Sequence, residues 1–469
     1  MQDKILGENT QICNSIGNRI QNAGLWKTAG VDADDTRTHL VSPTPFPLNE
    51  KQVDTLNKLG KALLAFYQGV NALYLRSDIK WVKDYLDIGK PNDLIRQAAM
   101  KYHKNLVPGV IRPDILLTED GFAITELDSV PGGMGHLDCL CAAYRDLGFD
   151  LIGSGMRDGF AAMIKGAAGR EDPTCAIIVS DESIDYLPEM TFLAQRLREI
   201  GLRAYTVRPK EVIFTEDGLL IEVDECKERV DVIYRFFELF DLMNIPKSEL
   251  VSYAARKKLA VVTPPYKHFF EEKMLLGLFH SGSLRDYWMS ALGEEHYYLL
   301  KATFAPTFIM DNHPVPPHAE IAGFRWQGKP IRDWREIANG TQKDRRMILK
   351  PSGFSPLAWG ARGVKVGHDM AQNDWADSVE HALASFDNSP YVLQPFQDTS
   401  LFGVKYYDES GISEMKARVR LCPYYFVNGS NAELGGVLAT ACPKNKKLIH
   451  GMVDAVLSPC YLQQNNERE

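Results

Sequence analysis

Apolar residues between Asn49 and about Ile79 recur at the spacing of a helix. This spacing places them on one face of an amphipathic helix, which packs that face against a core. The helical pattern continues through about Lys104, and a further helix begins within Leu137–Ala142. The chain up to residue 104 is therefore predicted to be mainly helical. The positions that define the first apolar stripe are Val53, Leu56, Leu59, Leu63, Leu64 and Tyr67.

A continuous apolar run, Cys175–Ser180, is typical of a buried parallel strand. A helical pattern over Leu187–Ile200 follows it, and then a second apolar run, Leu202–Val207. Strand, helix and strand in succession predict a βαβ unit, to which Val230–Tyr234 adds a buried strand. We expect a small Rossmann-like domain here. No GxGxxG sequence follows its first strand, so we do not expect it to bind a dinucleotide.

The last third of the chain has a helical pattern from about Phe269 to Phe279 and an ending rich in strands. These strands are predicted at Met347–Lys350, Val364–Val366, Tyr391–Pro395, Lys416–Val427 and Gly436–Thr440. The stretch Lys165–Pro173 has the composition of a linker. The patterns together predict an α/β (α+β) fold. The expected units are a helical region at 1–104, a hairpin and first core segment at 105–171, the Rossmann-like unit at 172–265, and a final unit at 266–461.

Two apolar runs, Ile111–Thr118 and Phe122–Leu127, flank Glu119-Asp120-Gly121 and predict a β-hairpin. In such a hairpin the glycine supplies a positive φ angle. We expect a loop of three residues, which sets the pairing of the two strands. That pairing decides which side chains share a face, because side chains alternate along a strand.

With this loop, Asp114 lies opposite Glu126 and Arg112 lies opposite Asp128, all on one face. Three carboxylates on one half-buried surface repel each other unless a proton, an arginine or a hard cation such as Mg²⁺ balances them. The glycine-rich turn Pro131–Gly135 follows at once and suits close approach of a phosphate. A magnesium–phosphate site is one interpretation, and a solvent-facing acidic hairpin is the other.

A second candidate site begins at Lys350, which ends an apolar strand. The loop after it runs to the next strand and contains serine and glycine residues that can close on a phosphate. The sequence does not match the Walker pattern GxxxxGK[ST]. An ordinary hairpin loop with solvated basic residues remains the alternative. The loop residues in question are Ser352, Gly353, Gly360 and Gly363.

Farther on, the strand Tyr391–Pro395 carries Gln394 and ends at a proline. An edge of this kind, with an apolar wall and free backbone groups, suits an adenine ring.

Composition narrows the classes of partner. The net charge of −8 argues against non-specific binding to nucleic acid, which needs a basic surface. The sequence has no run long enough to span a bilayer, and its N-terminus lacks a signal-peptide pattern, so we expect a cytoplasmic protein. The 8 cysteines show no zinc-type spacing and are expected to be reduced and mostly buried. Small molecules are the expected partners, and a homo-oligomer is left open.

These motifs together resemble the ATP-grasp superfamily, in the circularly permuted branch typified by the synthetase domain of glutathionylspermidine synthase. The family's metal strands carry Arg-x-Asp and Glu-x-Asn, which here are Arg112-Pro-Asp114 and Glu126-Leu-Asp128. Its two nucleotide lysines match Glu272-Lys273 and Leu349-Lys350-Pro351, and its hinge glutamine matches Gln394. The motifs follow in the family's order over about residues 105–400.

The chain departs from the family pattern at two places. Asp128 stands where the family has asparagine, which adds negative charge. The family's arginine after a glycine pair in the closing strands is absent beyond Gly435-Gly436, and Arg418 or Arg420 is a candidate to replace it. The amidase domain of some relatives has no counterpart here.

The resemblance implies an ATP-grasp-like fold with an inserted pre-ATP-grasp domain, and an ATP- and Mg²⁺-dependent carboxylate–amine ligase that works through an acyl phosphate. It assigns Arg112 to catalysis, Asp114, Glu126 and Asp128 to the metal, and Lys273 and Lys350 to phosphate oxygens. Small-molecule acid and amine substrates are implied without their identities. A nucleotide-binding regulatory or assembly protein without turnover and a kinase that forms an acyl phosphate remain alternatives.

Overall fold

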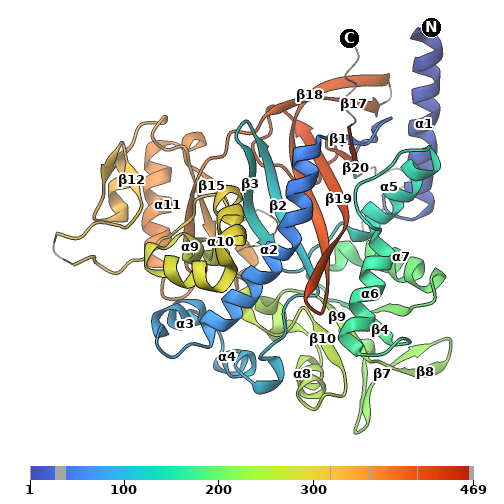
Figure 1. The fold of residues 1–469 in the computed structure, drawn as a ribbon, viewed down its shortest axis with the longest axis horizontal. Coiled ribbons are helices and arrows are strands. Elements are labelled where there is room, and N and C mark those ends of the chain that lie inside the picture. The colour runs from blue at the N-terminus through green and yellow to red at the C-terminus, as the bar shows by residue number, and fades with distance from the viewer. Residues whose placement is uncertain are drawn as a thin grey trace.

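The computed structural model describes residues 2–26, 38–316, 318–358, 360, 362–408 and 410–463. Helices and sheets both contribute to the core, so the predicted mixed α/β class is confirmed (Figure 1). None of the helices in these ranges combines the length and the apolar character needed to cross a bilayer. The helices are α1 Gln2–Asn22, α2 Glu50–Tyr74, α3 Lys80–Asp87, α4 Asn92–Ala98, α5 Met134–Asp146, α6 Met156–Ala168, α7 Leu187–Glu199, α8 Ser248–Arg256, α9 Met274–His280, α10 Arg285–Thr303 and α11 Gln372–Ala384.

A large sheet forms the centre of the molecule. Its strand order is β1-β20-β19-β18-β2-β3, and β17 pairs with part of β18. All of its pairings are antiparallel except that between β1 and β20. The strands are β1 Phe46–Leu48, β2 Val110–Thr118, β3 Gly121–Asp128, β17 Leu401–Asp408, β18 Gly411–Asn428, β19 Asn431–Pro443 and β20 Val456–Leu462.

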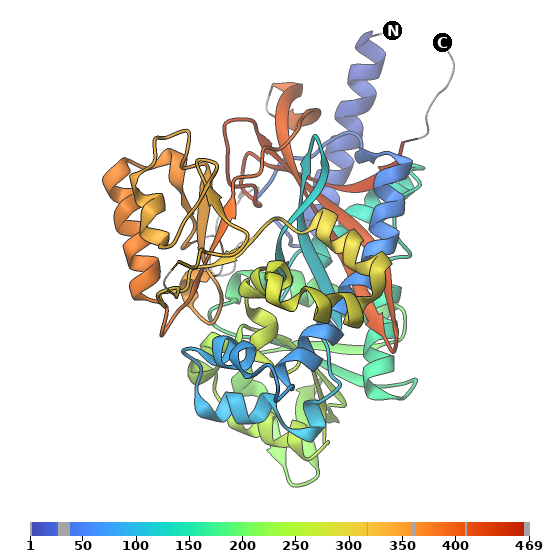
Figure 2. The ribbon, with the colours of Figure 1, turned by 60° about the vertical axis from the view of Figure 1, so that its left-hand side comes forward.

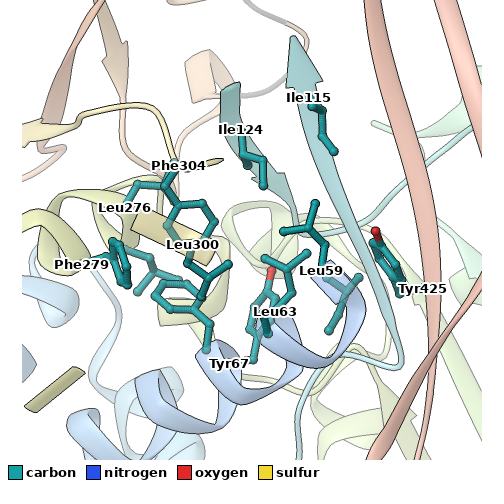
Figure 3. Packing of buried hydrophobic residues seen from close by; sticks show 14 of the residues in the cluster. Leu59, Leu63, Tyr67, Ile115, Ile124, Leu276, Phe279, Leu300, Phe304 and Tyr425 are labelled. Carbon is teal, nitrogen blue, oxygen red and sulfur yellow. The ribbon is translucent and has the colours of Figure 1, made fainter. Parts of the chain in front are cut away.

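Helix α2 crosses one face of this sheet (Figure 1). It begins with a capping box, in which Asn49 and Gln52 each accept a hydrogen bond from the other's backbone N–H. Its apolar stripe packs on Ile115 of β2 and Ile124 of β3, and side chains of α9 and α10 complete the cluster (Figure 3). The predicted amphipathic helix is therefore confirmed, and its stripe is buried against the sheet.

The opposite face of the sheet is covered by α5 and α6, which bury alternate residues of β18 such as Cys422, Tyr424 and Phe426. Arg112 and Asp114 of β2 have the same parity as Val110, which belongs to this second cluster. The acidic hairpin therefore presents its polar residues on the face away from α2.

A smaller sheet is wholly parallel and lies in the green part of the ribbon (Figure 2). Its order is β10-β9-β4-β5, with β4 Thr174–Val179, β5 Arg203–Val207, β9 Val232–Phe236 and β10 Val261–Thr263. The predicted β4-α7-β5 unit is confirmed, because β4 and β5 pair in parallel. A hairpin sheet of β6 Ile213–Thr215, β7 Gly218–Val223 and β8 Cys226–Arg229, which the sequence analysis did not predict, joins β5 to β9.

A third sheet is antiparallel, has the order β11-β16-β14-β15 and carries α11 on one face. Its strands are β11 Phe308–Ile309, β14 Met347–Pro351, β15 Lys365–Val366 and β16 Tyr391–Pro395. A two-stranded ribbon, β12 Arg325–Trp326 and β13 Lys329–Pro330, lies close by. This unit stands to the left of the central sheet in Figure 2. The expected domain boundaries at residues 104, 171 and 265 stay predictions.

Candidate functional site

The turn of the acidic hairpin differs from the prediction. Thr118 pairs with Gly121, so the loop has two residues, Glu119 and Asp120, and not three. A loop of this length would by itself place Asp114 opposite Thr125. The structure restores the expected pairing with a register shift at Thr125, the extra residue of a β-bulge.

The bulge decides which way the carboxylates of β3 point. Phe122 and Ile124 face the apolar cluster under α2, and strict alternation would send Glu126 to the same side. The extra residue reverses the alternation, so that Glu126 lies opposite Asp114 and Asp128 lies opposite Arg112. The predicted pairing is thus confirmed, although the predicted loop is wrong.

Arg112 holds two carboxylates of this face. Its Nη2 lies 3.0 Å from Asp114 Oδ1 and also contacts Asp128, while Nη1 donates to the Gly132 carbonyl at 3.1 Å. Asp114 is reached from the other side by Arg420 of β18, whose Nη1 lies 2.7 Å from Oδ2. Burial raises the pKa of Asp114, but the two guanidiniums outweigh it and bring the pKa below its usual value. Asp114 is therefore ionised and shared by two arginines.

The pKa of Asp128, in contrast to that of Asp114, is raised. Burial raises its pKa, Arg112 lowers it, and the charges of Asp114 and Glu126 raise it again, so that it ends above its ordinary value. Burial and the repulsion from two neighbouring carboxylates therefore outweigh the one guanidinium that Asp128 contacts. A cation near Asp128 would relieve this repulsion.

Lys273 and Lys350 reach the hairpin from separate parts of the chain. Lys273 precedes α9, and its Nζ lies 2.9 Å from Glu126 Oε1 and 2.8 Å from the carbonyl of Ala358. Lys350 lies on β14, and its Nζ lies 3.5 Å from the carbonyl of Thr125. Burial lowers the pKa of Lys350, and Lys273 lowers it further. The two lysines are close enough to influence each other although 77 positions separate them in the sequence (350 − 273 = 77).

Gln394 shares an acceptor with Lys350. Its Nε2 donates to the Thr125 carbonyl at 3.1 Å and to Thr307 Oγ1 at 2.9 Å. The residue is buried on β16, which pairs with β14 so that Gln394 lies opposite Ile348. The bulge therefore has a second structural consequence. The carbonyl of Thr125, its extra residue, accepts hydrogen bonds from Lys350 and Gln394 on the neighbouring strands.

Only some of the predicted residues of the loop after β14 reach the cleft. Gly353 and Gly360 line the cleft described below. Ser352 is fully buried: its Oγ accepts from the Met274 N–H at 2.9 Å and donates to Glu272, so it holds the start of α9. Gly363 packs on Pro351, where a Cβ atom would come within 2.5 Å of the ring. Ser352 and Gly363 therefore shape the loop from behind, and only the other two glycines line the space.

One cleft of about 410 Å³ joins these groups. Its walls come from the hairpin, from β14 and β16, from β18, and from the segment after β9. Of the predicted site residues, the cleft is lined by Arg112, Asp114, Glu126, Asp128, Lys273, Lys350, Gly353, Gly360 and Gln394. The predicted convergence of Lys273 and Lys350 on a cleft is thus seen in the structure, and the roles of these residues stay predictions.

The sequence analysis missed several residues of this cleft. Ser129 Oγ donates to Glu238 at 2.7 Å, and Tyr186 also lines the cleft. Burial raises the pKa of Glu238 well above its usual value, and the charges of Glu271 and Asp128 add to the effect. Glu238 follows β9 at the carboxyl end of the parallel sheet, where ligands of such sheets usually bind. The position of Glu238 directly after a predicted buried strand was the sequence signal that could have identified it.

The carboxylates fit a magnesium ion in their donor chemistry, because Asp114, Glu126 and Asp128 offer oxygen atoms from adjacent strands. In this structure each of them contacts an arginine or a lysine. Within the described ranges, no group of three or more histidine, cysteine, aspartate or glutamate side chains is arranged to hold a metal ion. The three residues stay predicted ligands. Asp128 fits a nearby cation best, because Arg112 does not fully offset its burial and its repulsion from Asp114 and Glu126.

The fold is similar to that of a glutathione synthetase-like effector from Globodera pallida, solved in its apo form. The two chains are 11% identical and superpose with a TM-score of 0.60 over 98% of this chain and 97% of the other. A putative gamma-glutamylcysteine synthetase from Methylobacillus flagellatus KT is also similar, at 11% identity and a TM-score of 0.44 over 91% of this chain and 92% of that one. No family model and no curated protein matches the sequence. The first similarity shows a shared fold along nearly the whole chain.

Proposed function

We propose that this protein is an ATP- and Mg²⁺-dependent ligase that joins a carboxylate to an amine through an acyl phosphate. ATP supplies the phosphoryl group, and its magnesium ion neutralises the charge that develops on it. The observation that carries the proposal is the meeting of Lys273, Lys350 and the Asp114–Glu126 pair in one cleft. The fold shared with a glutathione synthetase-like protein supports it, because its name refers to a ligase that forms an amide bond.

The lysines are the expected partners of the phosphate oxygens. Both lie on the β3 side of the hairpin, and Lys350 has no carboxylate within 4.0 Å among the described residues. Burial lowers its pKa more than the charges of Glu126 and Asp114 raise it, so an approaching anion would favour the charged form of the lysine. Lys273 now holds Glu126 and the Ala358 carbonyl, and it exchanges these contacts for phosphate when nucleotide binds.

Arg112 is the proposed catalytic residue. It lies between Asp114 and Asp128, and its Nε is buried without a hydrogen-bond partner among the described residues. Its guanidinium lines the cleft, so it can bond to the transferring phosphoryl group, whose charge spreads over its outer oxygens in the transition state. Asp114, Glu126 and Asp128 are the residues that would hold the magnesium ion.

The first test is nucleotide binding by the Lys350→Ala variant, measured by calorimetry with magnesium present. We expect affinity for ATP to fall about tenfold or more, since a charge-assisted contact to phosphate is lost. Lys365→Ala is the matched control, because Lys365 is exposed on the neighbouring strand β15 and should leave affinity unchanged. Equal affinity in wild type and Lys350→Ala would contradict the nucleotide assignment.

The second test is turnover. Phosphate release is measured with panels of small acids and amines, and mass spectrometry detects the amide. Release that requires an acid, with an amide formed when an amine is added, supports the ligase. Tight ATP binding with no acid-dependent release would favour the regulatory alternative, and hydroxylamine trapping without any amide would favour a kinase.

A further inference from the structure

A buried ion pair lies behind the two lysines of the cleft. Lys90, in the segment between α3 and α4, contacts Glu272, and their side chains are 1% and 0% exposed. Neither residue lines the cleft, but Glu272 directly precedes Lys273. A buried pair adds little to stability by itself, because the desolvation of both charges offsets their attraction. What this pair contacts is therefore more informative than its strength.

Glu272 orients the hydroxyl group of Ser352. Lys90 holds one oxygen of Glu272, and the other, Oε2, accepts the hydroxyl hydrogen of Ser352. Ser352 Oγ then accepts from the Met274 N–H at 2.9 Å, and the Ser352 carbonyl accepts from the Lys273 N–H at 2.8 Å. Because these two amides stand at the start of α9, the serine fixes where that helix begins.

The same serine connects the two lysines assigned to the nucleotide phosphates. Ser352 directly follows β14 and lies two residues after Lys350. Lys273 is bonded to it through the backbone. The separation of the two lysines thus depends on how Ser352 is held, and the Glu272–Lys90 pair holds its side chain from behind.

Lys90 also lies against the loop that follows β14. Its Nζ is 5.8 Å from the centre of the Phe354 ring, and Phe354 lines the cleft. The φ angle of Phe354 is 47°, a left-handed conformation that a bulky residue rarely adopts. Gly353 packs on the same pair, because a Cβ atom there would lie 3.0 Å from Glu272 Oε1. The pair therefore supports the first residues of the loop as well as the start of α9.

We propose that Lys90 is a positioning residue for nucleotide binding, which anchors Glu272 and so fixes Lys273 and Lys350 at the separation that the ATP phosphates require. The inference rests on the proposed function, since it is the phosphates of ATP that the two lysines are held to meet. The helical region before the central hairpin thereby contributes to the cleft without lining it. An apolar pair could fill the same space, but it would offer Ser352 no acceptor for its hydroxyl group.

The test is the binding of a non-hydrolysable ATP analogue with magnesium to the full chain, measured by calorimetry. Each variant is studied well below its melting temperature, so that loss of folded chain does not contribute. We expect Lys90→Met to weaken affinity about tenfold, because charge-assisted contacts with phosphate depend on the placement of both lysines. Lys90→Arg keeps the charge in a different shape and should recover part of the affinity.

A double variant separates positioning from stability. Lys90→Met leaves Glu272 buried without its cation, which should lower the melting temperature. Lys90→Met/Glu272→Gln removes both charges and leaves an unanchored amide beside Ser352, so it should restore the melting temperature but not the affinity. Arg235→Met is the matched control, because it breaks the adjacent buried pair with Glu271 and should lower the melting temperature without changing the affinity.

Hydrogen exchange provides a readout that needs no nucleotide. The amides of Lys273 and Met274 should exchange about fivefold faster or more in Lys90→Met and in the double variant, and at the wild-type rate in Arg235→Met. Wild-type affinity in Lys90→Met, recovery of affinity in the double variant, or unchanged exchange of the two amides overturns the inference. A wild-type chain that does not bind the analogue contradicts the proposed function instead, and faster exchange in Lys90→Met then still supports the positioning of Lys273.

Discussion

Two buried arginines of this protein show how differently an ion pair can be built. Arg235 at the end of β9 pairs with Glu271 at 2.8 Å, and its other nitrogens donate to the carbonyls of Pro264 and Phe237. Glu271 is also satisfied, because its second oxygen accepts from the Leu239 N–H at 2.9 Å. Every polar atom of that pair has a partner within the protein.

Arg112 in the cleft is also buried, yet its Nε has no partner among the described residues, and the Nε of Arg420 likewise has none. A buried donor without a partner costs free energy, so chains rarely retain one without reason. The closed pair holds two segments of the fold together. The open cluster leaves two guanidinium nitrogens unsatisfied at the wall of the cleft.

The largest effect is expected for Arg112→Ala. If Arg112 acts on the transferring phosphoryl group, kcat falls about 10³-fold while the KM for ATP changes little, because the contact strengthens only as charge develops. Turnover at saturating ATP and magnesium is measured beside the melting temperature. Full turnover in a destabilised variant would reject the catalytic role and leave Arg112 as the counter-ion of Asp128.

A smaller effect, and one on stability, is expected for Arg235→Met. The change leaves Glu271 buried without its cation and should lower the free energy of unfolding by about 3 kcal/mol, as measured by urea denaturation. The folded fraction should retain its kcat. The double variant Arg235→Met/Glu271→Leu should regain much of the loss, since no buried charge is then left unpaired. An unchanged midpoint in the single variant would contradict the view of this pair as a structural element.

Much of the fold was readable because its signals are local. The stripe of α2, the strand Cys175–Ser180 and the helix that follows it all depend on spacing along a short segment, and each forms close to its predicted bounds. Which side chains converge is a different matter. Lys273 and Lys350 could be brought to one cleft only through the resemblance, because nothing in their separate segments specifies the contact with β3.

The β-bulge at Thr125 is a feature of the hairpin that the sequence analysis did not predict. The predicted three-residue loop gave the correct pairing of Asp114 with Glu126, but the chain reaches it with a two-residue loop and an extra residue at Thr125. The apolar positions Phe122, Ile124 and Leu127 already broke the strand period after Ile124. Read for its spacing, that break would have located the bulge. The carbonyl contacts of Thr125 could not be predicted, since they involve β14 and β16.

The smallest effect, a modest loss of ATP affinity, is expected from deleting Thr125. The deletion removes the bulge while leaving Glu126 opposite Asp114, because the two-residue turn alone then sets that pairing. The carboxylate face should survive, but Gln394 and Lys350 lose the carbonyl to which both donate.

We expect the deletion to weaken ATP binding about five- to tenfold, because two modest hydrogen bonds that orient the donors are lost, without a change in magnesium dependence. Thr125→Ala is the matched control, because it keeps the bulge and its carbonyl and alters only the side chain. Calorimetry on both variants decides the matter. If the deletion leaves ATP affinity at the level of Thr125→Ala, the bulge serves only to point the carboxylates away from the core, and the cleft gains no donor alignment from it.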